Sequence, residues 1–191
     1  MILELDCGNT LIKWRVISSD SGDVVFVGVA ANVAELLVEL QCLSALSLQR
    51  CRLVSVRGEE ETAQLIAAIE HAFGLMCCLA KPALCVAGVR NGYADYQRLG
   101  MDRWLAIIGA YQLARGACLV LDLGTAITAD YVNAAGEHLG GYICPGLPLM
   151  RGLLRTHTQR IRYEAPVAGC NGQALRPGRT TTDAVERGRL L

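Results

Sequence analysis

One pattern occurs twice in the chain and constrains its fold more than any other feature. A short apolar run ends on Asp6 and is followed two residues later by Gly8, and the same arrangement returns at Asp122 and Gly124. In each copy small or hydroxyl residues come next, and then another segment rich in β-forming residues. A single Asp-x-Gly is typical of an ordinary hairpin turn. Two copies indicate a chain of two related halves that hold one ligand between two similar turns.

The repeated turn has the chemistry of a phosphate site. Glycine permits a positive φ and lets a phosphate approach the backbone, and the exposed N–H groups of a tight turn form an anion site. The carboxylate of Asp6, at the end of its strand, is placed to hold Mg²⁺ through water, because that ion keeps much of its hydration shell. These features together favour nucleotide binding. Further donors follow the two turns, namely Asn9, Thr10 and Lys13 after the first and Thr125 and Thr128 after the second.

Composition and charge argue against several classes of protein. The 191 residues are 52% hydrophobic, enough for a substantial core, and the net charge is zero with a pI near 6.8. The sequence has no basic run of the kind that binds nucleic acid or anionic membranes, no apolar run near the roughly 18 residues of a membrane span and no signal-peptide pattern. Nine cysteines without a C-x-x-C pair are expected to be reduced thiols. We therefore expect a cytoplasmic protein.

Hydrophobic periodicity predicts two α/β domains, residues 1–117 and 118–191. In the first, three strands in a meander precede alternating helices and strands, which predicts a mixed sheet covered by helices. The second begins in the same way. The expected elements of the first domain are a strand ending at Asp6, strands at 11–17, 23–29, 52–56 and 75–79, a helix capped by Asn32 that includes 35–40, and a helix at 59–73. Those of the second are strands at 119–123, 127–132 and 138–144, a break at 145–148, a helix at 149–158, a loop at 165–179 and a helix from Thr182 or Asp183.

Residues 89–104 form a polar, aromatic and glycine-containing segment between the halves, as expected of a functional loop. Asp102 stands near the start of a helix expected at 103–113. It is either the N-cap of that helix or a base for an alcohol nucleophile beside bound phosphates, and the two roles are compatible. Arg103 either binds an anionic substrate group bidentately or pairs with a surface carboxylate. Tyr93 either lines a small pocket or packs.

These motifs resemble the type III pantothenate kinases, which belong to the superfamily of acetate kinase, sugar kinases, chaperones and actin. The motifs occur in the family's order and cover nearly the whole chain. The resemblance implies duplicated actin-like, ribonuclease H-like halves with mixed sheets flanked by helices. It also implies ATP-dependent phosphorylation of the primary hydroxyl of pantothenate, the first step of coenzyme A synthesis. The matching stretches are Asp6–Lys13, Gly100–Trp104, Asp122–Thr125, Gly140–Gly146 and Thr180–Gly188.

The resemblance further implies roles for single residues. Asp102 would be the general base, and Asp122 corresponds to a position associated with a monovalent cation, potassium or ammonium. The ATP-binding residues would be Asp6, Cys7, Gly8, Asn9, Thr10, Leu11, Ile12 and Lys13, with Thr125 from the second turn. The residues around pantothenate would be Tyr93, Gly100, Met101, Asp102, Arg103 and, from the neighbouring subunit of a homodimer, Thr181.

The chain differs from the family pattern after Leu191, where family members continue with a helix, a strand and a glycine-rich segment that closes over the adenosine. We therefore expect an incomplete second half, and weak ATP binding by the isolated chain. Two alternatives stay open. A different small-molecule kinase of the same superfamily would be identified by a panel of acceptors assayed with ATP. A non-catalytic nucleotide-binding or regulatory protein would be recognised by calorimetric titration with ATP and pantothenate.

Overall fold

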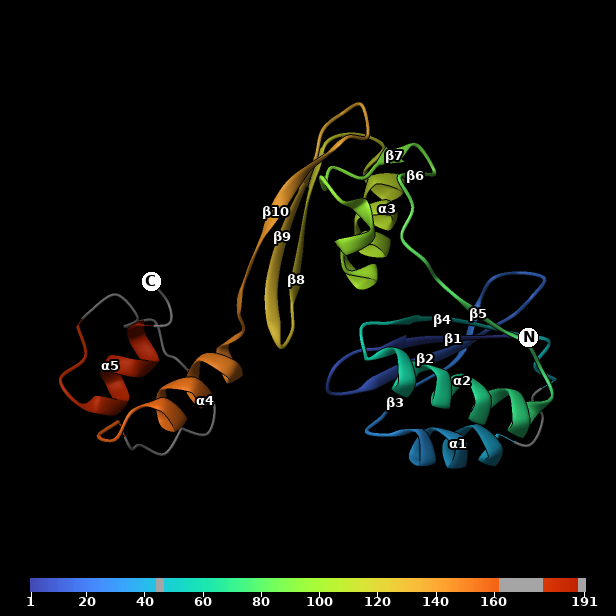
Figure 1. Ribbon diagram of the computed structural model, residues 1–191, viewed down its shortest axis with the longest axis horizontal. Coiled ribbons are helices and arrows are strands. Elements are labelled where there is room, and N and C mark those ends of the chain that lie inside the picture. Colours follow the sequence, from blue (N-terminus) through green and yellow to red (C-terminus); the bar gives the residue numbers. More distant parts are fainter. Residues whose placement is uncertain (44–46, 162–176, 189–191) are drawn as a thin grey trace. The chain divides into compact units, whose positions relative to one another are not determined.

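The computed structural model describes residues 1–43, 47–161 and 177–188. The chain forms two compact units (Figure 1). The first comprises Met1–Val120 with Asp130–Gly140, and the second comprises Leu121–Ala129 with Gly141–Leu191. The strands after residue 117 therefore contribute to both units. A domain boundary between residues 117 and 118 stays a prediction.

The first unit contains a mixed five-stranded sheet in the order β3-β2-β1-β4-β5. Its strands are β1 (Ile2–Cys7), β2 (Ile12–Ile17), β3 (Val24–Ala30), β4 (Arg50–Ser55) and β5 (Cys77–Leu79). β2 is antiparallel to both β1 and β3, whereas β4 is parallel to β1 and β5. The sheet thus has the meander and the parallel strands that the sequence predicted, with bounds that differ by a few residues at most.

Two helices, α1 (Val33–Cys42) and α2 (Glu59–Phe73), cover the same face of this sheet (Figure 1). Asn32 caps α1 as expected, because its Oδ1 accepts a hydrogen bond from the Glu35 N–H at 3.0 Å. Alternate residues of β1 point into the helical layer, as the period of a strand requires. The core of this layer includes Leu3, Leu5 and Cys7 of β1, Leu36 and Leu40 of α1, and Leu65 and Ile69 of α2.

The segment after β5 leads to helix α3 (Met101–Ala114). It contains a hairpin that the sequence did not predict, formed by β6 (Cys85–Val86) and β7 (Val89–Arg90). Strands of two residues are too short to show a period-2 pattern. The buried side chains Trp104 and Ile107 of α3 belong to a second hydrophobic cluster, which also includes Val54 of β4. This cluster fixes α3 against the first sheet.

The remaining strands are β8 (Cys118–Leu123), β9 (Ala126–Val132) and β10 (His138–Pro145), in the order β10-β9-β8. The three strands were predicted from the sequence. Helix α4 (Leu147–His157) begins two residues before the expected start. Pro148 lies in its first turn, where a missing N–H costs no helical hydrogen bond. The predicted break at 145–148 thus contains the end of β10 at Pro145 and the first turn of α4.

The last described helix is α5 (Thr181–Gly188), which begins one residue before Thr182 and two before Asp183, the two predicted starts. Thr180 Oγ1 accepts a hydrogen bond from the Asp183 N–H at 3.1 Å, as an N-cap side chain does. Arg151 of α4 forms two hydrogen bonds to Glu186 of α5, from Nε at 2.8 Å and from Nη2 at 2.6 Å. Most of the loop expected at 165–179 lies outside the described residues.

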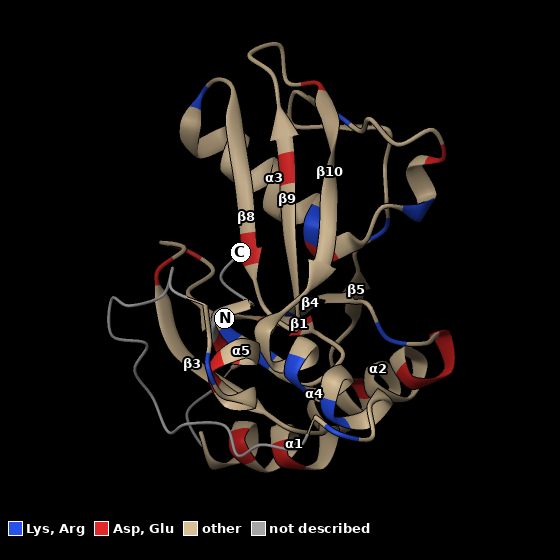
Figure 2. Cartoon of the chain, turned by 90° about the vertical axis from the view of Figure 1, so that its left-hand side faces the viewer, with Lys and Arg blue, Asp and Glu red and all other residues tan. Residues whose placement is uncertain are grey.

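The described residues carry charges of both signs and free thiols. Acidic and basic residues occur in both units, and neither sign is confined to one of them (Figure 2). All eight cysteines in the described part of the chain are free thiols. Among the described helices, none has the length and apolar character needed to cross a membrane.

Candidate active site

The first Asp-x-Gly turn joins β1 to β2. The Gly8 N–H donates a hydrogen bond to the Leu11 carbonyl at 3.1 Å and closes the turn. Glycine permits a positive φ, but neither Gly8 nor Gly124 adopts one. A Cβ at Gly8 would instead lie 3.3 Å from the Leu11 carbonyl oxygen. The close approach of the backbone to itself is therefore what favours glycine here.

The carbonyl groups of this turn are held by the loop that follows β4. The Val56 N–H donates to the Cys7 carbonyl at 3.1 Å, and Arg57 Nε donates to the Gly8 carbonyl at 2.8 Å. The N–H and C=O groups of a trans peptide point in opposite directions. With the Gly8 carbonyl directed at Arg57, the Asn9 N–H therefore points away from Arg57, which is the orientation that an anion-binding turn needs.

Arg57 was missed in the sequence analysis, although a signal for it exists. Its side chain is largely buried, and its Nη1 also pairs with Glu61 at 2.7 Å. β4 runs parallel to β1, so the loop after β4 lies at the same edge of the sheet as the first turn. A basic residue in that loop could have been assigned to the turn from topology alone.

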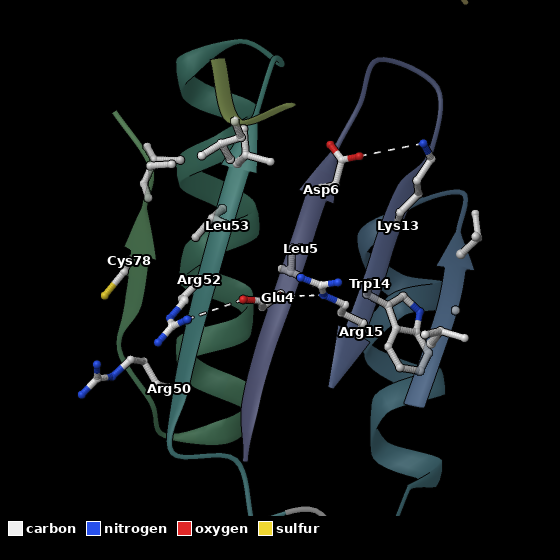
Figure 3. A pocket seen from close by; sticks show the side chains of 17 residues that line it. Glu4, Leu5, Asp6, Lys13, Trp14, Arg15, Arg50, Arg52, Leu53 and Cys78 are labelled. Carbon is white, nitrogen blue, oxygen red and sulfur yellow. Dashed lines mark hydrogen bonds and ion pairs between the residues drawn. The ribbon is translucent and has the colours of Figure 1, made fainter. Parts of the chain in front are cut away.

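Asp6 and Lys13 face each other directly across β1 and β2. Lys13 Nζ lies 3.9 Å from Asp6 Oδ2, and the two side chains are 69% and 46% exposed, respectively. Exposed pairs contribute little to stability, so both groups can change partners at small cost. Figure 3 shows them at one end of the sheet face, beyond the ion pairs of Glu4 with Arg15 and Arg52. This face borders a cavity of about 800 Å³.

Asp102 lies in the first turn of α3 and is exposed. The interpretation of Asp102 as N-cap is wrong, because the helix starts at Met101 and its cap is Gly100. A Cβ at Gly100 would lie 2.7 Å from Asp102 Oδ1, so the glycine leaves room for the carboxylate. Leu105, one turn later, lines the same cavity as Asp6 and Lys13. Residues three apart are neighbours on a helix surface, so Asp102 lies next to Leu105, although Asp102 itself is not among the residues that line this cavity.

Arg103 has a carboxylate partner that the sequence analysis did not identify. Its Nε donates to Asp130 Oδ2 at 2.9 Å, its Nη2 donates to Asp130 Oδ1, and its Nη1 donates to Tyr93 Oη at 2.7 Å. Asp130 is buried within β9, so it is not the surface carboxylate that had been considered. The hydrogen bonds to Asp130 raise the pKa of the guanidinium, and Arg103 stays charged. An acidic residue within an apolar strand was the available signal for this partner.

Tyr93 is half-buried and packs at the edge of the second hydrophobic cluster. Its ring lies under the Arg103 guanidinium at 5.6 Å from carbon to ring centroid. It also stacks on the His138 ring, with centroids 6.0 Å apart and an interplanar angle of 15°. The structure therefore brings Tyr93 together with Gly100, Met101, Asp102 and Arg103, as the sequence analysis grouped them.

The second Asp-x-Gly turn joins β8 to β9, and Asp122, Gly124 and Thr125 are exposed. The Gly124 N–H donates to the Ala126 carbonyl at 2.9 Å, and the Gly146 N–H donates to the Thr125 carbonyl at 2.8 Å. A Cβ at Gly146 would lie 2.3 Å from the Gly124 carbonyl oxygen. The N-terminus of α4 thus contacts the second turn so closely that only glycine fits at its cap. An anion at this turn would also meet the positive end of the helix dipole.

Thr181, the remaining predicted site residue, is exposed at the start of α5. It lines a groove of about 450 Å³ between α4 and α5, together with Met150, Arg151 and Leu154 of α4. In the described residues, no group of three or more His, Cys, Asp or Glu side chains is arranged to hold a metal ion. The Mg²⁺ and monovalent-cation assignments of Asp6 and Asp122 stay predictions.

The family model and the curated relatives agree on one family. The family model described as type III pantothenate kinase matches residues 2–191. The type III pantothenate kinases of Pseudomonas fluorescens (strain SBW25) and Pseudomonas putida (strain W619) are each 58% identical over 191 residues, which is 100% of this chain and 77% of those proteins. A solved structure, a putative 2-dehydro-3-deoxygalactonokinase from Sinorhizobium meliloti, is similar with a TM-score of 0.48 and 16% identity, over 83% of this chain and 58% of that one.

Proposed function

The chain belongs to the type III pantothenate kinase family, and we propose that its two Asp-x-Gly turns and the N-terminal turn of α3 carry the residues of its active site. The protein is a kinase that phosphorylates pantothenate at its primary hydroxyl with ATP, in the first step of coenzyme A synthesis. Its fold is the α/β class with actin-like halves that the motifs implied. Membership of this family favours a pantothenate kinase over the two alternatives that the sequence left open, which are a different small-molecule kinase and a non-catalytic nucleotide-binding or regulatory protein.

One observation supports the proposed site more than any other. Asp102 is exposed, and Leu105, its neighbour on the surface of α3, lines the same cavity as Asp6 and Lys13. A base that takes a proton from an alcohol must be accessible to both solvent and substrate. An aspartate with only a structural role at the start of a helix needs hydrogen bonds to the helix backbone alone. We assign Asp102 as the base that accepts the hydroxyl proton of pantothenate.

The phosphates of ATP are assigned to the first turn, Asp6–Lys13, with Thr125 contributing from the second. Backbone N–H groups such as that of Asn9 and the ammonium of Lys13 would neutralise charge on the transferring oxygens. Positioning of ATP and pantothenate provides most of the catalysis, because the protein takes part in little covalent chemistry during phosphoryl transfer.

A divalent metal accompanies ATP in kinases, and we assign Mg²⁺ to Asp6. The residue fits such an ion, because a single half-exposed carboxylate leaves room for the waters and phosphate oxygens that Mg²⁺ prefers. Bound there, the ion would offset the negative charge of the phosphates. Asp122, also exposed, is assigned to potassium or ammonium. Free thiols throughout the described residues support a cytoplasmic location.

The substitution Asp102→Asn tests the base assignment. It keeps the volume of the side chain and removes its ability to take a proton, so we expect turnover to fall by about 10²- to 10⁴-fold. The thermal midpoint should stay within a few degrees, because the side chain is exposed. Asp20→Asn, a similarly exposed change in the β2–β3 turn, is the matched control and should keep full activity. Turnover of Asp102→Asn at the wild-type rate would overturn the assignment.

We also propose a homodimer in which Thr181 contacts pantothenate bound to the neighbouring subunit. Its exposure at the N-terminus of α5 supports this role. Mixing inactive Asp102→Asn subunits with inactive Thr181→Trp subunits would restore one intact site per mixed dimer, or about a quarter of wild-type activity after random pairing. A mixture as inactive as its components would contradict shared sites.

A further inference from the structure

Four side chains from separate segments meet directly behind the proposed base. Arg103 comes from α3, Asp130 from β9, His138 from β10 and Tyr93 from the loop before α3. Arg103, Asp130 and His138 are 7%, 1% and 3% exposed. The Arg103 N–H also donates to Asp102 Oδ1 at 2.7 Å. The buried cluster is thus joined through Arg103 to the residue assigned as base.

The hydrogen bonds of Arg103 restrict what this residue can offer to a substrate. The edge formed by Nε and Nη2 is occupied by both oxygens of Asp130. A guanidinium binds a carboxylate most strongly through two parallel bonds on one edge. That edge is already used within the protein, so Arg103 is arranged as a fixed support and not as a bidentate clamp for substrate.

The same bonds leave a defined donor on Tyr93. Its hydroxyl oxygen accepts from Arg103 Nη1 at 2.7 Å. Arginine carries no acceptor, so the phenolic proton of Tyr93 must point to another acceptor. Accepting a bond from a cation also polarises the hydroxyl and makes it a better donor. Half-buried and hydrogen-bonded to Arg103, the residue after Asp102, Tyr93 is the member of the cluster that reaches solvent.

His138 contacts both Asp130 and Tyr93. Its Nε2 lies 3.0 Å from Asp130 Oδ1, and a carboxylate can only accept, so Nε2 carries the proton. Its ring stacks on the Tyr93 ring. The backbone at Gly92 approaches the His138 carbonyl so closely that a Cβ there would lie 1.7 Å from the oxygen. Asp130 therefore receives hydrogen bonds from both Arg103 and His138, and both of these contact Tyr93.

We propose that Asp130 and His138 are positioning residues for pantothenate, which hold Arg103 and Tyr93 so that the Tyr93 hydroxyl donates a hydrogen bond to the substrate next to Asp102. This inference rests on the proposed function. Apolar residues of equal volume would serve a purely structural core as well as a buried ion pair does. The buried ion pair of Arg103 and Asp130 orients Tyr93, which lies at the edge of the proposed site.

The test uses His138→Phe, which keeps an aromatic ring to stack on Tyr93 and removes the donor to Asp130. Affinity for pantothenate is measured by calorimetry, and KM and kcat by steady-state kinetics. We expect pantothenate to bind about tenfold more weakly, with the KM for ATP within about twofold of wild type. His138→Gln, whose amide can donate to Asp130 again, should recover most of the affinity.

Tyr93→Phe keeps the test decisive if a buried variant fails to fold, because it removes only a hydroxyl from a half-buried side chain. It should weaken pantothenate binding at least as much as His138→Phe. If His138 acts through Tyr93, the double variant binds no more weakly than Tyr93→Phe alone. Thr62→Val, a change at a buried polar residue of α2 that is hydrogen-bonded to Ser55, is the control and should lower stability without altering pantothenate affinity.

Three outcomes would overturn the inference: additive losses in the double variant, equal losses for ATP and pantothenate, or unchanged pantothenate affinity in Tyr93→Phe. Failure of the proposed function looks different, because wild-type protein would then neither bind nor phosphorylate pantothenate. Wild-type phosphorylation together with unaltered affinity in the variants rejects the positioning role alone.

Discussion

The two Asp-x-Gly turns look alike in sequence and differ in how the structure supports them. The first stands on β1, whose alternate residues Leu3, Leu5 and Cys7 are buried against helices. The second stands on β8, whose leucines at 119, 121 and 123 are 49%, 60% and 76% exposed. An apolar run before a turn therefore predicts the strand correctly but does not say how much of that strand becomes core.

The contacts of the two turns differ in kind. At the first turn a side chain, Arg57, binds the Gly8 carbonyl in addition to the backbone bond from the Val56 N–H to the Cys7 carbonyl. The second is contacted by backbone, because Gly146 at the start of α4 packs on Gly124 and Thr125. The first turn should thus depend on a charged hydrogen bond and the second on steric fit. Each dependence can be tested by substitution.

The largest contrast is expected between Asp6→Asn and Asp122→Asn. With Asp6 assigned to the metal and phosphates, its loss should lower kcat/KM for ATP by about 10²- to 10³-fold, the size of a lost electrostatic contact in a transition state. Asp122→Asn should instead reduce activation by potassium. Activity is measured across Mg²⁺ and potassium concentrations. Identical losses with identical ion profiles would mean that the two turns do the same chemistry.

Steric fit should matter more at the second turn than at the first. Gly146→Ala places a Cβ against the Gly124 carbonyl and should lower the free energy of unfolding by about 1–3 kcal/mol, as overpacking does. Gly8→Ala meets Leu11 at a looser 3.3 Å and should cost less. Chemical denaturation of the two variants gives both values. A larger loss at Gly8 would reverse the comparison.

The charged support should matter at the first turn alone. Arg57→Gln removes the bond to the Gly8 carbonyl and should raise the KM for ATP by about tenfold, with pantothenate binding unchanged. Glu61→Gln alters the exposed partner of the same arginine, so a change below about twofold is expected. If both variants bind ATP like wild type, the bond is not needed to shape the turn.

The smallest effect concerns the cysteine beside each turn. Burial raises the pKa of Cys7 to about 11, whereas Cys144, near Gly146, is exposed. Iodoacetamide at neutral pH should therefore modify Cys144 at least about tenfold faster than Cys7, as mass spectrometry of peptides would report. Exposed Cys42 is the positive control. Comparable rates would show that the first turn opens readily.

The raised pKa of Cys7 also predicts that the stability of the folded state falls at alkaline pH. The thiol stays protonated in the folded state above the ordinary value of 9.0. Its contribution to stability is therefore complete below about pH 9 and is lost as the pH rises to about 11. Denaturation midpoints of wild type and Cys7→Ala, measured across this range, should converge at the alkaline end.

Patterns within a few residues determined much of this protein. The two turns, the strands before them and the Asn32 cap depend on neighbours in the chain, and so does the motif around Asp102. Local sterics and hydrogen bonds decide such features, and each could be predicted. The predicted N-cap of α3, Asp102, lies two residues after the observed cap, Gly100. Glycine and aspartate both occur often at N-caps, and a single sequence does not show which of the two takes the position.

Tertiary structure decided the partners of the buried charges. Arg103 meets Asp130 across 27 positions and Arg57 meets Gly8 across 49. Neither pair follows from spacing, because the packing of α3 against β9 and the parallel pairing of β4 with β1 bring them together. A buried guanidinium must find a carboxylate or carbonyl wherever the fold supplies one. The sequence therefore predicted the groups that we propose to contact the substrate, while tertiary packing determined which groups hold them in place.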